Sequence, residues 1–188
     1  MTELFKQFID SLVTLEAGAW DDLQSVLKQR TLKRKEHFLR EGEVCRSIGF
    51  ITQGYIRLYY LREGEEITKD FNFETNFCGS HASFSMQAPS RFNIVAMEDV
   101  TLLEITRTDL YALYDKYKSF ERLGRLLMER MFDRKEQRES AFLQDDAETR
   151  YQDLLKMHPQ ITQRVPLKYI ASYLGITAET LSRLRAVR

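Results

Sequence analysis

Cysteine, long apolar runs and net charge are all scarce in this sequence. Its two cysteines, Cys45 and Cys78, are far apart and form no C-x-x-C pair, so we interpret them as partly buried thiols and not as a disulfide framework. No apolar run reaches the roughly 18 residues that a membrane helix needs. The N-terminal segment mixes Glu3, Lys6 and Asp10 into its apolar residues, unlike a signal peptide. These features predict a cytoplasmic protein with no membrane partner.

The charge of the chain is balanced overall but not along its length. The 28 basic and 28 acidic side chains cancel. Between Ile161 and Arg188, however, five cations stand against a single anion, Glu179, so this end is basic and the remainder is acidic. A basic end of this kind favours a nucleic-acid partner. Its cations are Arg164, Lys168, Arg183, Arg185 and Arg188.

Stretches with different hydrophobic periods divide the sequence. Residues 1–30 carry apolar side chains at helical spacing and predict short helices. Residues 31–105 predict many short strands with turns at near-regular intervals. From residue 107 the helical spacing returns. The fold class we predict is α+β, with a β-sandwich, barrel or jelly roll followed by helices.

Turns organise the strand region. Gly54 supplies the positive φ of a tight reversal, and we predict a hairpin that joins the strands on its two sides. Arg62–Glu65 form a second turn. Glu98-Asp99 lie between Phe92–Met97 and Thr101–Ile105, which we predict to be a further hairpin.

A long helix is predicted from Ser119 to about Leu143, with Ser119 as its cap. It carries an apolar stripe, but its second half is polar on most faces. Because so long a helix cannot be fully buried in a small protein, the stripe indicates a partner helix and a homodimer; packing on the chain's own strands is the alternative. The predicted dimer-interface residues are Leu123, Leu126, Leu127 and Met131.

Beyond this helix, Asp145-x-x-Glu148 resembles a capping box that opens a helix from Ala147 to about Met157. His158-Pro159 would end that helix. We place a domain boundary near Asp145.

The stretch Val165–Arg188 has the pattern of two short helices joined by a tight turn. Pro166 favours the start of the first helix, Gly175 follows where a left-handed residue would end it, and Thr177 is placed to cap the second. This is the signature of a helix-turn-helix; an ordinary α-hairpin with a solvated polar face is the alternative. The inward apolar positions are Ile170, Ala171, Leu174, Leu181 and Leu184.

The opposite face of the second helix carries groups that can read DNA. A glutamate accepts a hydrogen bond from cytosine N4, and an arginine donates two to guanine. Hydroxyls near a helix start, and flanking cations, suit phosphate contacts. The predicted DNA-binding residues are Lys168, Thr177, Ala178, Glu179, Thr180, Ser182, Arg183 and Arg185.

The order of helix, β-roll, long helix and helix-turn-helix resembles the Crp/Fnr family of bacterial transcription regulators over nearly the whole chain. The resemblance is strongest at SYLGITAETLSRLR, residues 172–185. It implies a cyclic-nucleotide-binding-like double-stranded β-helix over residues 1–118, a dimerisation helix over 119–144, and a helix-turn-helix domain over 145–188 that lacks a full C-terminal wing. Glu179 and Arg183 match positions that read DNA in the family, whereas Ala178 replaces an arginine, so the base preferences differ. The implied partners are double-stranded DNA, a second copy of the chain and RNA polymerase.

The segment Phe77-Cys78-Gly79 resembles part of the family's cyclic-nucleotide-binding roll, but one position differs. The Gly-Glu of the binding cassette, whose glutamate holds the ribose hydroxyl, is Gly79-Ser80 here, which argues against cyclic AMP. Arg91 matches the phosphate-binding arginine with a shifted register. We therefore assign no cofactor and expect a small anionic effector. The alternative is a pocket filled by Phe84, Met86 or Phe92. The predicted ligand-binding residues are Gly79, Ser80, His81, Ala82, Ser83, Ser90 and Arg91.

Other classes share parts of this pattern. A cupin-type metalloenzyme has the same roll shape but needs clustered ligands, and His37, His81 and His158 lack such spacing. A haem sensor stays open because Cys78 and His81 are three residues apart, whereas two separated cysteines cannot hold an iron–sulfur cluster. A sensor that acts on a protein partner without binding DNA is a further alternative. We expect no catalytic residue and no metal site.

Overall fold

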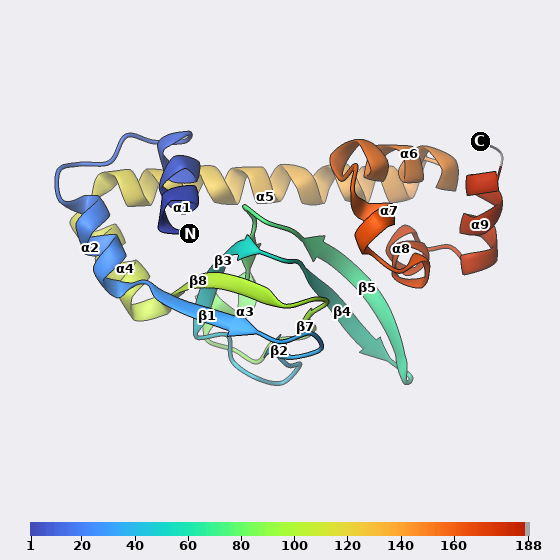
Figure 1. Ribbon diagram of the computed structural model, residues 1–188, viewed down its shortest axis with the longest axis horizontal. Helices are drawn as coiled ribbons and strands as arrows, with labels where there is room; N and C mark the ends of the chain where they lie inside the picture. Colours follow the sequence, from blue (N-terminus) through green and yellow to red (C-terminus); the bar gives the residue numbers. More distant parts are fainter. Residues whose placement is uncertain (187–188) are drawn as a thin grey trace. The chain divides into compact units, whose positions relative to one another are not determined.

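The structure is a computed structural model that describes residues 1–186. The chain divides into two compact units, Met1–Met128 and Glu129–Arg188, and the long helix α5 (Lys118–Gln144) contributes to both (Figure 1). Arg188, counted above among the basic residues, lies outside the described residues.

Two four-stranded antiparallel sheets make up most of the first unit. The strands are β1 (Lys28–Leu32), β2 (His37–Leu39), β3 (Ser47–Gln53), β4 (Ile56–Arg62), β5 (Glu65–Asn72), β6 (Phe77–Cys78), β7 (Asn93–Ala96) and β8 (Val100–Thr106). The first sheet has the order β1-β8-β3-β6 and the second the order β2-β7-β4-β5. This pair of sheets confirms the predicted β-roll. Lys28–Arg30, predicted as helix, belong to β1 because they pair with β8.

The two hairpins predicted at Gly54 and at Glu98-Asp99 are wrong, because the chain crosses between the sheets at both places. β3 pairs with β6 and β8, whereas β4 pairs with β5 and β7. Gly54 does have a positive φ, +85°. Its turn also packs against the other crossing, since a Cβ added at Gly54 would lie 2.5 Å from the carbonyl oxygen of Asp99. Turn residues mark a reversal of the chain but do not say which strand will accept the hydrogen bonds.

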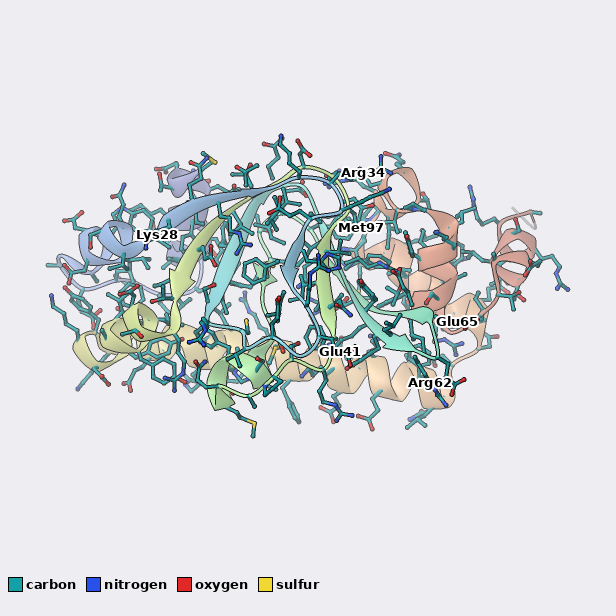
Figure 2. The ribbon with its side chains drawn as sticks, turned by 90° about the horizontal axis from the view of Figure 1, so that it is seen from below. Lys28, Arg34, Glu41, Arg62, Glu65 and Met97 are labelled. Atoms are coloured by element: carbon teal, nitrogen blue, oxygen red, sulfur yellow. The ribbon has the colours of Figure 1, made fainter. Side chains whose placement is uncertain are left out.

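The turn at Arg62–Glu65 is a hairpin, as its sequence predicted (Figure 2). Arg62 pairs with Glu65 across it. The two central residues both have positive φ, +53° at Glu63 and +84° at Gly64, which is the combination of a type I′ turn.

Apolar side chains fill the space between the sheets and cover the outer face of the first sheet. That face packs on helices α1 (Thr2–Asp10), α2 (Ala19–Val26), α4 (Arg107–Lys116) and the start of α5. There the rings of Phe5 and Phe50 stack with centroids 4.5 Å apart. The interior cluster consists of Leu32, Phe38, Leu39, Cys45, Ile51, Ile56, Leu58, Cys78, Phe84, Ile94, Ala96, Val100 and Leu102.

Glu16, and not Ser119, caps the start of α5. The backbone N–H of Ser119 donates to Glu16 Oε1 at 3.1 Å, and the Ser119 hydroxyl donates to the same carboxylate. The hydrogen bond from this hydroxyl is the largest cause that lowers the pKa of Glu16. The sequence therefore located the helix but not its cap, because the capping group lies about a hundred residues away in sequence.

The second unit contains the end of α5 followed by helices α6 (Ala147–Met157), α7 (Ile161–Arg164), α8 (Leu167–Leu174) and α9 (Ala178–Ala186). The bounds of α6 are those that the sequence predicted. Its cap is Asp146 and not Asp145, since the N–H of Thr149 donates to Asp146 Oδ1 at 2.8 Å.

Candidate nucleic-acid interface and ligand site

The turn between α8 and α9 is fixed by backbone and hydroxyl contacts. Gly175 ends α8 with a φ of +70°, and the N–H of Ile176 donates to Ala171 O at 3.0 Å, as in a Schellman-type helix end. Thr177 Oγ1 then accepts from the N–H of Thr180 at 3.2 Å and caps α9. The local geometry matches what the sequence predicted for both residues.

α9 presents one apolar and one polar face. Leu181 is fully buried, and α9 packs on α8, where Ile170 and Ala171 are also buried. Thr180 is half-buried, while the other predicted DNA-binding residues are exposed: Lys168, Thr177, Ala178, Glu179, Ser182, Arg183 and Arg185. The exposed face therefore offers one carboxylate and several cations to a partner.

The carboxyl group of Glu179 is ionised at neutral pH. Hydrogen bonds from its own backbone N–H and from the Thr177 hydroxyl lower the pKa of Glu179, and the positive charge of Arg183 acts in the same direction. Glu179 is thus an acceptor only, as hydrogen bonding to a cytosine amino group requires.

Two arginines that the sequence reading missed hold the end of α8. Arg138 on α5 donates to Tyr173 O at 3.3 Å, and Arg150 on α6 donates to Leu174 O at 3.2 Å. The ring of Phe142 contacts both guanidinium groups, with centroid distances of 5.3 and 4.9 Å. These cations satisfy carbonyls that a helix end leaves free. Only the spacing of Arg138 and Phe142, four residues apart on one helix face, hinted at this cluster.

The predicted interface residues on α5 do not form one exposed stripe. Leu123 is 7% exposed and joins the cluster beneath α1 and α2, against which Leu126 and Leu127 also pack. Met131 is half-buried. The large apolar side chains that α5 exposes are Met128, Phe132, Phe142 and Leu143.

The predicted ligand residues lie around the short helix α3 (His81–Met86), and the hydroxyls of Ser83 and Ser90 bind the protein's own backbone. Ser83 Oγ accepts from the N–H of Cys45 at 2.9 Å and donates to Ala88 O. Ser90 Oγ donates to Phe92 O at 2.8 Å. Ser80 is buried as the residue before α3, and Gly79 is half-buried. His81, Ala82 and Arg91 are exposed.

Of the side chains expected to plug the roll, two lie in it. Phe84 is buried in the interior cluster, and Phe92 packs against that cluster. Met86 is 75% exposed. Aromatic carbon therefore occupies part of the roll interior.

Both cysteines belong to the same interior cluster as free thiols. Burial raises the pKa of Cys45 and raises that of Cys78 further, so neither thiol is readily ionised. Cys78 is fully buried in this cluster, whereas His81 is exposed.

Residues 1–186 contain neither a metal-binding cluster nor a membrane-spanning helix. No group of three or more His, Cys, Asp or Glu side chains there could hold a metal ion. No helix in this part of the chain is long and apolar enough to cross a membrane.

The strand region is similar to one known family of domains. Residues 29–117 match the model of the cyclic nucleotide-binding domain. The β-roll therefore resembles a cyclic nucleotide-binding domain. No curated protein matches the chain.

Solved structures extend the similarity beyond this domain. FixK2 from Bradyrhizobium japonicum superposes with a TM-score of 0.74 at 17% identity, over 86% of this chain and 83% of its own. A protein from Eubacterium rectale described as a Crp/Fnr-family transcriptional regulator gives 0.69 at 19% identity, over 90% and 82%. The c-di-GMP responsive regulator CLP from Xanthomonas campestris gives 0.66 at 15% identity, over 90% and 89%. The resemblance to Crp/Fnr regulators is therefore confirmed, and at these identities it establishes the fold.

Proposed function

We propose that this chain is a cytoplasmic transcription regulator of the Crp/Fnr type that binds double-stranded DNA as a homodimer. In this proposal residues 1–118 are the sensor, residues 119–144 dimerise, and residues 145–188 form a helix-turn-helix domain. RNA polymerase would be a further partner. The chain would then be a regulator and not an enzyme.

The observation that carries the proposal is the exposed face of α9. Glu179 and Arg183 lie four residues apart on one side of the helix, while Leu181 on the other side is fully buried. The Thr177 cap and Gly175 turn fix the start of this helix. A carboxylate and a guanidinium held on one exposed helix face suit readout of cytosine and guanine in the major groove.

Direct binding tests the proposal. Fluorescence anisotropy with labelled genomic fragments should detect saturable binding that weakens steeply with salt, since phosphate contacts release counterions. A chain that binds no duplex at low salt would instead favour a sensor acting on a protein partner.

For the sensor we propose a small anionic effector. The cyclic nucleotide-binding domain supports a small-molecule ligand, and the replacement of the ribose-binding glutamate by Ser80 argues against cyclic AMP. A ligand-independent regulator is the second candidate, favoured by Phe84 and Phe92 in the roll. Mass spectrometry of the natively purified protein separates the two, because only the first predicts a co-purified anion.

A further inference from the structure

A hollow of about 490 Å³ lies at the edge of the first sheet, where β1 and β3 begin and β8 runs into α4. It is separate from the interior cluster of the roll. Its volume falls within the roughly 300–1,000 Å³ typical of small-molecule sites. The lining residues are Lys28, Arg46, Ser47, Gln87, Glu104, Thr106, Arg107 and Thr108.

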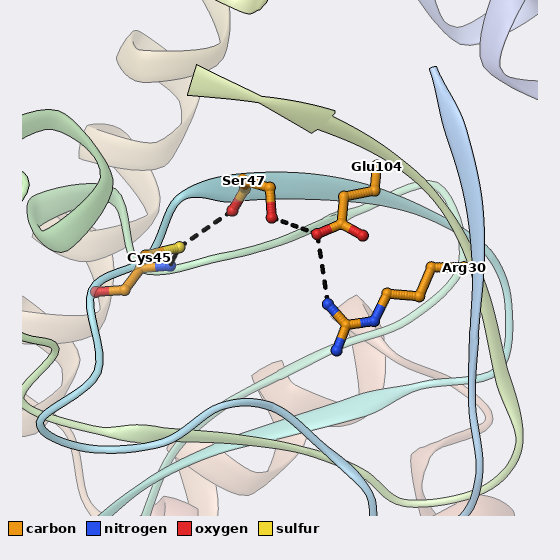
Figure 3. A network of polar contacts seen from close by, with 5 residues as sticks. Arg30, Cys45, Ser47 and Glu104 are labelled. Carbon is orange, nitrogen blue, oxygen red and sulfur yellow. Dashed lines mark hydrogen bonds and ion pairs between the residues drawn. The ribbon is translucent and has the colours of Figure 1, made fainter. Parts of the chain in front are cut away.

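The hollow carries an excess of positive charge. Lys28, Arg46 and Arg107 bring three cations, and within residues 1–186 none of them forms an ion pair. The one lining carboxylate is already engaged. Glu104 accepts from Arg30 at 3.4 Å and from the Ser47 hydroxyl (Figure 3). Unpaired cations around a concave surface raise the local concentration of anions.

Arg107 is the residue best placed to receive an anion. Its guanidinium lies over the Tyr111 ring, 4.2 Å from the centroid, and its Nε is buried with no acceptor among the described residues. A buried donor without an acceptor is costly, so a ligand oxygen there would be favoured. The backbone N–H of Arg107 donates to the backbone oxygen of Arg46 at 2.9 Å, which holds the two cationic residues side by side.

The start of α4 adds to the positive charge around the hollow. Arg107 is the first residue of the helix after the Thr106 cap, so the partial positive charge of the helix N-terminus reaches the hollow. Asp109 offsets part of it, because its carboxylate accepts from the Thr106 hydroxyl in the same turn. Hydroxyls of Ser47 and Thr108 also line the hollow.

We propose that this hollow binds a small organic phosphate and that it, and not the roll interior, is the anionic-effector site. A guanidinium group can donate two parallel hydrogen bonds to a phosphate group, and lysine ammonium and hydroxyl groups can bind its remaining oxygens. The same wall contacts α3, since Cys45 Sγ donates to Ser47 O at 3.1 Å and Cys45 N–H donates to Ser83 Oγ at 2.9 Å. A regulatory role for the bound anion rests on the proposed function of the chain; the binding of the anion does not.

Isothermal titration of the full chain with inorganic pyrophosphate tests the site. We expect one bound anion per chain. Arg46→Ala and Arg107→Ala should each weaken the affinity about tenfold or more, as for the loss of a charge-assisted hydrogen bond. Arg34→Ala is the matched control, an exposed arginine of the same unit outside the hollow, and it should leave the affinity unchanged. Thermal unfolding curves verify that all three variants fold.

Three results would overturn the proposal. Pyrophosphate that shows no binding at millimolar concentration removes the site. Binding that Arg91→Ala abolishes and Arg107→Ala spares moves the anion to the mouth of the roll. If Arg107→Ala weakens binding to every duplex while pyrophosphate does not bind, the hollow contacts DNA phosphates instead. Conversely, a chain that binds pyrophosphate as expected but no duplex contradicts the proposed regulator and retains the anion site.

Discussion

Arg138 and Tyr173 meet in two ways: the guanidinium lies 4.2 Å from the ring centroid, and it donates to the Tyr173 carbonyl oxygen at 3.3 Å. Arg138 is on α5 and Tyr173 is in the last turn of α8. The contact therefore fastens the end of α8, next to the Gly175 turn, to the long helix within the second unit.

Removing this contact should loosen the second unit. We expect Arg138→Ala to lower its free energy of unfolding by about 1–3 kcal/mol, from one charge-assisted hydrogen bond and two ring contacts. The free energy of unfolding of Arg138→Lys should lie between those of the wild type and Arg138→Ala, because a lysine keeps the charge but not the planar stacking. Amide hydrogen exchange in α8 measures the effect, with Lys135→Ala on the exposed part of α5 as control. Equal exchange in Arg138→Ala and Lys135→Ala would contradict this role.

A side chain at Gly175 should destabilise the second unit. Its φ of +70° is unfavourable for other residues, and an added Cβ would approach Phe142 Cε1 to 3.1 Å. We expect Gly175→Ala to cost about 1–2 kcal/mol of unfolding free energy. Gly42→Ala is the control, since Gly42 has a φ of +87° but nothing within 4 Å of an added Cβ. Urea unfolding should find the larger loss at Gly175; a loss no greater than at Gly42 would mean that Phe142 simply moves aside.

The link between α2 and α4 should depend on pH in the acid range. Asp22 accepts from Lys116 Nζ and from Tyr117 Oη, and these two hydrogen bonds lower the pKa of Asp22 below its ordinary 3.8. A carboxyl whose pKa is lower when folded stabilises the protein above the unfolded-state pKa, and this is lost as pH falls through the folded-state pKa. We expect Asp22→Asn to be less stable than the wild type at pH 7, with the difference vanishing at the acid end. Thermal melts across that range would refute the assignment if the difference grew as pH fell.

The exposed part of α5 should mediate dimerisation. Phe132 is 68% exposed and Met128 is 37% exposed, one helical turn apart. Phe132→Asp should therefore give a monomer at micromolar concentration in light scattering, because a buried unpaired carboxylate is costly. Leu123→Ala should chiefly lower stability, since Leu123 is 7% exposed within its own unit. A wild-type chain that is itself monomeric would contradict the homodimer.

The sequence predicted elements whose cause is local and missed those whose cause is distant. Gly175 and Thr177 were correctly placed because a left-handed residue and a hydroxyl cap act within one turn of chain. Glu16 as the cap of α5 could not be found, because its partner Ser119 meets it only after folding. The sequence predicts hairpins at Gly54 and Asp99, where the chain in fact crosses between the sheets, because sheet membership is decided by distant strands.

The candidate sites follow the same division. The exposed face of α9 follows from helical spacing alone, so Glu179 and Arg183 could be named from sequence. The cationic hollow could not, because Lys28, Arg46 and Arg107 come from three separated segments and meet only through the pairing of β1 and β3 with β8.

A binding selection from random duplexes, carried out with the wild type, Arg183→Ala and Lys168→Ala, tests the central claim most directly. The account predicts that the wild type enriches a two-fold symmetric site with half-sites about 34 Å apart. Arg183→Ala should cost about 1–3 kcal/mol and lose preference at one base pair per half-site, whereas Lys168→Ala should weaken all sequences alike and keep the preference. An Arg183→Ala chain with unchanged sequence preference, or a wild type that enriches no sequence, would contradict DNA reading by α9.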